Sequence, residues 1–129
     1  MSKLLLIIML ALISTSSVAA WIKVGSNETV TIYAHPATIR KTTANNIEMW
    51  SLYDYNTVQK SIGSRPYMSV KFHNEYDCKK EQSRILYSVS HSKNMGGGRS
   101  IYNGTSDMIW TPIPPERTIK LLWKFASGK

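Results

Sequence analysis

The residue types that most often carry chemistry are sparse in this sequence and form no familiar catalytic pattern. Three histidines, His35, His73 and His91, lie far apart and lack the close spacing of a local metal site, so only the fold could bring them together. No Gly-x-Ser-x-Gly segment offers a serine nucleophile on a sharp turn. Gly96-Gly97-Gly98 precedes a β-like run rather than a helix, which favours a hairpin turn over a phosphate loop. The sequence therefore predicts a non-enzymatic protein with no catalytic residue, cofactor or metal site.

Two carboxylates, Glu75 and Asp77, share one face of an expected strand and resemble an acid/base pair. Lys71, Lys79 and Lys80 are close to them in the sequence. A solvated face of mixed charge is therefore the better interpretation.

The first 20 residues have the layout of a signal peptide. Lys3 gives a positive start, Leu4 to Ile13 is apolar, and Val18 and Ala20 suit the small-residue cleavage site. The apolar run is too short for a bilayer core of ~30 Å. We expect residues 1–20 to be removed and 21–129 to form one domain, exported to the periplasm or cell surface, with no transmembrane segment in the mature chain.

Positive charge is the clearest signal in the expected mature chain. The full chain has 129 residues, 16 Lys and Arg and 8 Asp and Glu, so loss of Lys3 leaves a net charge of +7. Such a charge favours an acidic protein or glycan, and no nucleic-acid motif is visible. The densest basic patch is expected on one hairpin, which gives five partner-binding candidates: Lys71, His73, Lys79, Lys80 and Arg84. The alternative is that these charges only keep the protein in solution.

Alternating apolar and polar residues predict a mostly antiparallel sheet of about five to six strands. After a short apolar–polar alternation at 21–24, the expected strands are 29–35, 47–55, 67–78, 84–90, 99–102 and 107–111. Pro36 is expected to interrupt the ladder of the first of these because it has no N–H. The Tyr67–Cys78 strand should have a wet face formed by Ser69, Lys71, His73, Glu75 and Asp77, and its partner should turn Ile85, Tyr87 and Val89 inward. Asn45-Asn46 and residues 78–83 read as turns.

A helix is expected from Glu116 to Ala126, after Pro114-Pro115 stops the sheet. Ile119, Leu122, Trp123 and Ala126 repeat at helical spacing. Strands followed by one helix predict the α+β class. Trp50, Trp110 and Trp123 are expected in the core, while Tyr53, Tyr55 and Tyr102 could instead form a binding surface.

Cys78 is the single cysteine, so an intrachain disulfide framework is excluded. It reads as a small buried hydrophobic residue. If it is exposed, it could join two chains in a homodimer, which a non-reducing gel and Cys78→Ser would test.

Several segments in order make the chain resemble the surface-adhesin protein E family of small exported Gram-negative proteins. The most specific piece is Ser69-Val-Lys71 followed by Glu75-Tyr-Asp-Cys78. The others are Trp21-Ile-Lys-Val24, His35-Pro-Ala-Thr-Ile-Arg40, Glu48-Met-Trp50-Ser-Leu52, Met95-Gly-Gly-Gly98, Trp110-Thr-Pro-Ile-Pro-Pro115 and Leu122-Trp123-Lys124.

The resemblance implies a small antiparallel sheet with a C-terminal helix, no catalysis, and binding of host extracellular-matrix or plasma proteins. It also reveals one departure. Related chains often carry a second cysteine just after the tryptophan of the last helix, and Ser127 stands there in this chain. The leading hypothesis is an exported adhesin-like module that binds through its basic sheet face, and the alternative is a periplasmic structural or enzyme-inhibitor protein.

Overall fold

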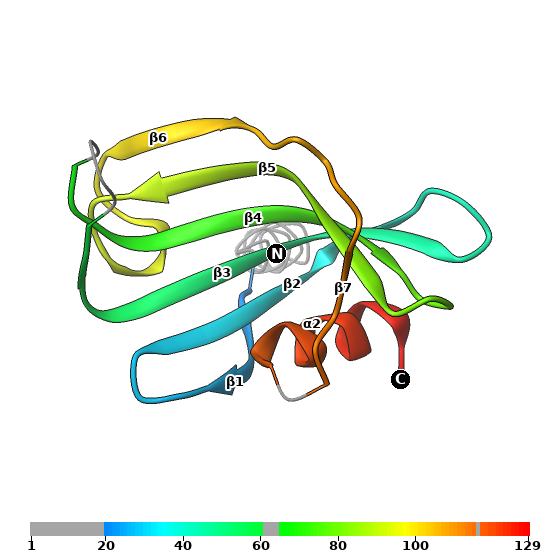
Figure 1. Ribbon diagram of the computed structural model, residues 1–129. Helices are drawn as coiled ribbons and strands as arrows, with labels where there is room; N and C mark the ends of the chain where they lie inside the picture. Colours follow the sequence, from blue (N-terminus) through cyan, green and yellow to red (C-terminus); the bar gives the residue numbers. More distant parts are fainter. Residues whose placement is uncertain (1–19, 61–64, 116) are drawn as a thin grey trace, which may run out of the picture.

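In the part of the chain that the structure describes, an antiparallel sheet has the α-helix α2 packed against one face (Figure 1). The computed structural model describes residues 20–60, 65–115 and 117–129. Strands β1 to β6 lie in the order of the sequence, and the short β7 pairs with β5. The elements are β1 (Ile22–Ser26), β2 (Val30–Lys41), β3 (Asn46–Gln59), β4 (Tyr67–Asp77), β5 (Gln82–His91), η1 (Asn94–Gly96), β6 (Ser100–Thr105), β7 (Thr111–Pro112) and α2 (Thr118–Ser127). The expected α+β class is confirmed.

Some sequence expectations fall outside the described residues. The signal peptide at 1–20 does so except for Ala20, and Glu116 does so as the expected helix start. The helix begins at Thr118, two residues later than expected, with Arg117 as its extended N-cap. It ends at Gly128, whose left-handed backbone (φ 70°) lets its N–H reach the carbonyls of Lys124 and Phe125.

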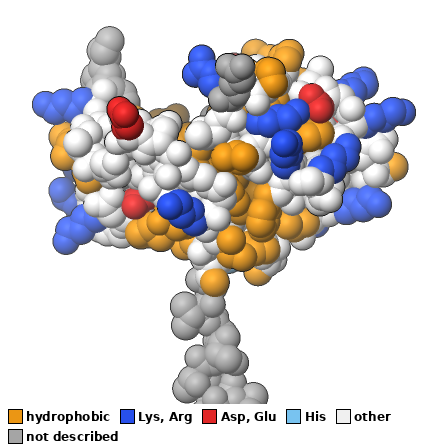
Figure 2. Space-filling model, turned by 90° about the horizontal axis from the view of Figure 1, so that it is seen from below, with side chains coloured by type: hydrophobic (Ala, Val, Ile, Leu, Met, Phe, Trp, Pro, Cys, Tyr) orange, Lys and Arg blue, Asp and Glu red, His pale blue; other side chains and the backbone are white. Residues whose placement is uncertain are grey.

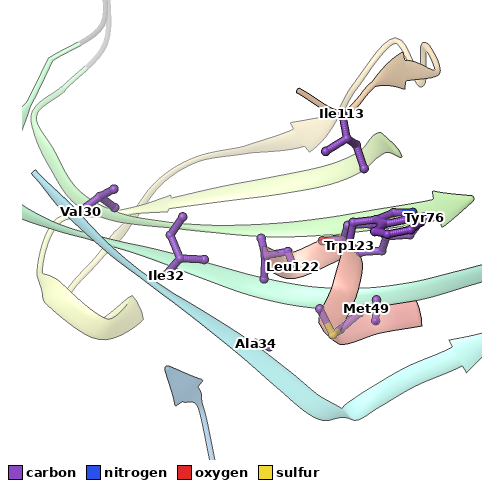
Figure 3. Packing of buried hydrophobic residues seen from close by; sticks show 9 residues of the cluster. Val30, Ile32, Ala34, Met49, Tyr76, Ile113, Leu122 and Trp123 are labelled. Carbon is purple, nitrogen blue, oxygen red and sulfur yellow. The ribbon is translucent and has the colours of Figure 1, made fainter. Parts of the chain in front are cut away.

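The core lies between α2 and the side chains of β1 to β4 that face the helix. The helix buries Leu122, Trp123 and Ala126, as its spacing predicted. Figure 3 shows Leu122 and Trp123 among sheet side chains that include Met49 and Tyr76. The indole Nε1 of Trp123 donates a hydrogen bond to the carbonyl of Asp77 at 2.8 Å, which fixes the helix to the end of β4.

Pro36 lies where the ladder between β2 and β3 is interrupted, as expected, but the strand itself does not end at His35. Strand β2 continues to Lys41, and its register with β3 shifts between His35 and Arg40. The side chain of Thr38 takes over hydrogen bonding at this irregularity, since its Oγ1 accepts from the N–H of Trp50 at 3.0 Å and donates to the carbonyl of His35 at 2.6 Å. The missing N–H of proline is tolerated because the ladder is already interrupted there.

Strand β5 also breaks the alternation that the sequence suggested. Its register with β4 shifts between His73, which pairs with Tyr87, and Asn74, which pairs with Ile85. The extra residue moves Tyr87 to the face opposite the helix, while Ile85 stays on the helix face. The expectation that Ile85, Tyr87 and Val89 share one inward face is therefore wrong.

The segment after β6 is a strap rather than a strand. Residues 106–110, here called the strap, make no ladder, and only Thr111 and Pro112 pair with β5. Figure 1 shows this segment crossing the sheet toward α2. Trp110 and Trp50 are half-buried and lie outside the core cluster, so only Trp123 confirms the expected role of the tryptophans.

Candidate functional site

The face of the sheet opposite α2, here called the open face, carries a row of rings. His35, Trp50, His73 and Tyr87 are direct partners across four neighbouring strands, which places them on one face. The rings of Trp50 and His73 stack at 4.9 Å with an interplanar angle of 7°, and Tyr87 meets Trp50 edge-on at 6.3 Å. We call these four residues the aromatic row.

His73, one of the five expected partner-binding residues, is thus engaged within the protein. Its Nε2 lies 3.6 Å from Glu48 Oε2, which also accepts a 2.7 Å hydrogen bond from Arg40. Burial lowers the pKa of His73, the charge of Glu48 raises it, and the charge of Arg40 lowers it again, with a net decrease. His73 is therefore a neutral stacking ring near neutral pH rather than a free positive charge.

A hollow opens beside the aromatic row, and Trp21, His35, Trp50, Lys71 and His91 line it. His91 is 8% exposed, and neither of its ring nitrogens has a hydrogen-bond partner among the described residues. Burial, and then the charge of Lys71, lowers the pKa of His91. Lys71, the second expected binding residue, is half-buried in this wall.

The connection between β5 and β6 folds over the same face. Asp54 Oδ1 accepts from the side chain of Asn94 at 2.9 Å and from the N–H of Met95 at 2.8 Å. Ser69 Oγ donates to the carbonyl of Lys93 at 2.6 Å and accepts from the N–H of Gly96 at 2.9 Å. This explains why Ser69 is fully buried, although it was expected on a wet face.

Glu75 corrects the same expectation. It is 5% exposed, and Arg84 donates to its Oε1 at 2.9 Å from Nε and at 2.7 Å from Nη2. Asn46 and Thr42 each donate to its other oxygen at 3.1 Å. Burial acts to raise the pKa of Glu75, but these hydrogen bonds and the charge of Arg84 outweigh it and hold the pKa below its usual value.

Arg84, the third expected binding residue, is consequently occupied. Besides its bond to Glu75, its guanidinium lies 4.7 Å from the ring centroid of Trp110. The pair Glu75 and Arg84 is a structural clamp, neither an acid/base pair nor a solvated charged face.

Lys79 and Lys80, the last two expected binding residues, are exposed at the β4–β5 turn. Their backbone N–H groups donate to Asp77 Oδ1 at 3.0 and 2.9 Å, which shapes the turn and leaves both ammonium groups free. Lys41 and Lys129 border a hollow with Lys79 at the same end of the molecule. We call Lys41, Lys79, Lys80 and Lys129 the lysine cluster.

Of the five expected residues, Lys71, His73 and Arg84 lie along the β4–β5 hairpin, and Lys79 and Lys80 lie at its turn. Lys71 lies six residues before the end of β4, a distance of about 20 Å along an extended strand. Four residues of these surfaces could not be identified as candidates from the sequence, because their positions depend on pairing between distant segments: Lys41, Lys129, Trp50 and His91. The shared face of the histidines became visible only through the strand register. In residues 20–60, 65–115 and 117–129, no group of three His, Cys, Asp or Glu is arranged to hold a metal ion.

The sequence profile described as surface-adhesin protein E matches residues 21–126. The chain belongs to the surface-adhesin protein E family. The match begins at the first residue after the expected signal peptide and spans the whole sheet and nearly all of α2. No curated protein matches the chain significantly.

Solved structures of protein E from Haemophilus influenzae share the fold of this family member. One matches with a TM-score of 0.62 at 11% identity and covers 88% of each chain. A second crystal form gives 0.64 at 12% identity, with 89% of this chain and 94% of that chain covered. A structure from a non-typeable strain gives 0.60 at 12% identity, with coverage of 85% and 76%. At such identities the likeness concerns the fold alone.

The departure implied by the family resemblance has a definite place in the structure. Cys78, which is free and partly exposed, borders the same hollow as Ser127. The Nζ of Lys129 donates to the carbonyl of Cys78 at 2.9 Å, so a hydrogen bond joins the segment after α2 to the end of β4 next to Ser127. Among the described helices, none has the length and apolar character needed to cross a membrane.

Proposed function

We propose that the protein is an exported, non-enzymatic adhesin-like binding module that engages an acidic protein or glycan through the lysine cluster. Membership of the surface-adhesin protein E family supports a binding role at the cell surface. A host extracellular-matrix component is the partner class we favour. The signal-peptide layout of residues 1–20 supports export.

The observation that carries this proposal is the division of positive charges into paired and unpaired groups. Arg40, Arg84 and Lys120 each contact a carboxylate at 2.7 to 3.0 Å. Within the described ranges, no member of the lysine cluster makes such a contact, and Lys41, Lys79, Lys80 and Lys129 are all exposed. Figure 2 shows Lys and Arg side chains gathered over the right-hand end of the molecule, where Figure 1 places the C-terminus.

Exposed lysines without a carboxylate partner suit an electrostatic contact with an extended anion. The cluster combines the β4–β5 turn, the end of β2 and the C-terminus, so its charges come from segments far apart in the sequence. Exposed charges of this kind steer an acidic partner and weaken as salt rises. In this proposal, Lys71, His73 and Arg84 stabilise the sheet and its open face rather than make the first contact with the partner.

The test is a binding array of matrix proteins, plasma proteins and acidic glycans probed with the purified exported protein at ~50 and ~500 mM salt. A double variant, Lys79→Glu with Lys80→Glu, should abolish a saturable, salt-sensitive signal. The matched control, Lys23→Glu with Lys60→Glu, changes two exposed lysines outside the cluster by the same charge. It should retain most of the signal. Equal loss in both variants, or binding unaffected by salt, would contradict the proposal.

Surface location is tested separately by protease treatment of intact cells. A surface protein should be cut at exposed basic turns such as the one holding Lys79 and Lys80. Full protection in intact cells, with cutting only after the outer membrane is opened, would instead support the periplasmic structural or inhibitory alternative.

A further inference from the structure

A third hollow lies on the helix face, between the strap, the first turn of α2 and the sheet. Its volume is about 420 Å³, within the size range of small-molecule sites. The floor includes Tyr53, Phe72 and Asn74, and the rim includes Ile85, Ile109 and Ile119. It is separate from both the lysine cluster and the open face. The strap crosses this region in Figure 1, and Figure 2 shows hydrophobic side chains along the hollowed middle of the surface.

Asn74 supplies an unused polar group in this largely apolar hollow. The residue is 4% exposed, and its Oδ1 has no hydrogen-bond donor among the described residues. A buried acceptor without a donor is unfavourable, and buried side-chain oxygens normally find a partner. Because Asn74 also lines the hollow, a donor on a bound molecule would satisfy it.

Two isoleucines at the rim leave a large part of their apolar side chains exposed. Ile109 is 63% exposed and Ile85 is 36% exposed, although both border the hollow. The residue before Ile109 is Met108, whose left-handed backbone (φ 59°) is uncommon for a residue with a side chain. Local strain of this kind often marks a ligand site.

The floor favours an uncharged aromatic body. The rings of Tyr53 and Phe72 lie 5.0 Å apart and meet nearly edge to face at 75°, an arrangement that accepts further rings. Burial, and then the neighbouring Tyr55, raises the pKa of Tyr53 to about 12, so this wall stays neutral. Asp107 and Arg84 both line the hollow, so its charges are one of each sign and favour neither an anion nor a cation.

We propose that this hollow binds a small neutral aromatic molecule whose hydroxyl or amide donor bonds to Asn74 Oδ1. The isoleucines cover the two sides of the ring, and the aromatic floor contacts its edge. A phenol has the required combination of a flat apolar body and one strong donor. The proposal is independent of the acidic partner and would survive failure of the lysine-cluster test.

The experiment titrates p-cresol and toluene into the purified exported protein with labelled isoleucine methyl groups and follows them by NMR. Toluene matches p-cresol in shape but lacks the hydroxyl. We expect p-cresol to shift the methyl signals of Ile85, Ile109 and Ile119, and to bind about tenfold more tightly than toluene. Asn74→Leu, which keeps the volume and removes the acceptor, should make the two ligands bind alike.

Two isoleucine variants complete the test and do not depend on folding of Asn74→Leu. Ile109→Ala truncates an exposed rim residue and should weaken both ligands several-fold. Ile39→Ala truncates an isoleucine that is 39% exposed and outside the lining of the hollow, and it should change neither. Unshifted rim methyl signals, equal affinity of the two ligands for the wild-type protein, or a hydroxyl preference that persists in Asn74→Leu would overturn the proposal.

Discussion

Replacing Ser127 by cysteine should create a disulfide to Cys78 and stabilise the fold. The two residues border one hollow. Two hydrogen bonds already hold the surrounding segments together, from Trp123 to the carbonyl of Asp77 and from Lys129 to the carbonyl of Cys78. The bridge would replace part of this polar attachment with a covalent bond at the point where α2 meets β4.

The expected gain follows from the length of the closed loop. Positions 78 and 127 enclose about 50 residues, and the chain-entropy relation gives about 4 kcal/mol for a loop of this length. For a domain of this size, that free energy corresponds to a rise in melting temperature of about 15–25 °C. The gain is largest if the native positions need little adjustment, because strain would reduce it.

The assay compares thermal unfolding of oxidised and reduced Ser127→Cys, with the bridge verified by mass spectrometry. The control, Cys78→Ser combined with Ser127→Cys, contains one cysteine and cannot form the ring. It should melt near the wild-type temperature in both redox states. Failure of the bridge to form under oxidising conditions would refute the placement of the helix end beside β4. A bridge that leaves the melting temperature unchanged would refute the argument from loop entropy.

Two further predictions concern buried ionisable groups. Arg84→Met should cost about 2 kcal/mol in urea unfolding, because it removes a charged hydrogen bond from the buried Glu75. Adding Glu75→Gln to that variant should recover part of the loss, and a cost near zero for Arg84→Met would contradict the clamp. The lowered pKa of His91 means that the unfolded chain binds its proton at higher pH than the folded chain does. Stability should therefore fall as pH drops below about 6.5. His91→Phe should flatten that fall between pH 7 and 5 in thermal unfolding, whereas an equal slope in both proteins would argue against it.

The sequence predicted the elements whose signals are local. The helical spacing of Leu122, Trp123 and Ala126 identified the buried side of α2, and the hairpin of β4 and β5 was found with nearly correct bounds. A signal that lies within one segment can be detected from the sequence of that segment alone. Periodicity also placed most strands, because β1 to β4 each pack one side against the helix.

The errors arose where distant segments change the local rule. The second strand was expected to span 29–35, but Thr38 supplies hydrogen bonds where the ladder is interrupted, and β2 continues to Lys41. Ser69 and Glu75 were expected in water, but the β5–β6 connection and the β2–β3 turn provide their partners. Alternation within β4 cannot show which loop will fold over it.

The register shift between β4 and β5 also explains why the aromatic row and the rim of the helix-face hollow could not be foreseen. The shift in β5 turns Tyr87 toward Trp50 and completes the aromatic row, while it leaves Ile85 on the helix face. One inserted residue therefore supplies an aromatic ring to one face and an apolar rim to the other. Because Leu86 is the unpaired residue between Ile85 and Tyr87, deleting it should remove the bulge and still leave these two side chains on opposite faces of a regular ladder. The candidate surfaces of this family member thus depend on where the alternation breaks, and the regular strands between the breaks hold those positions in place.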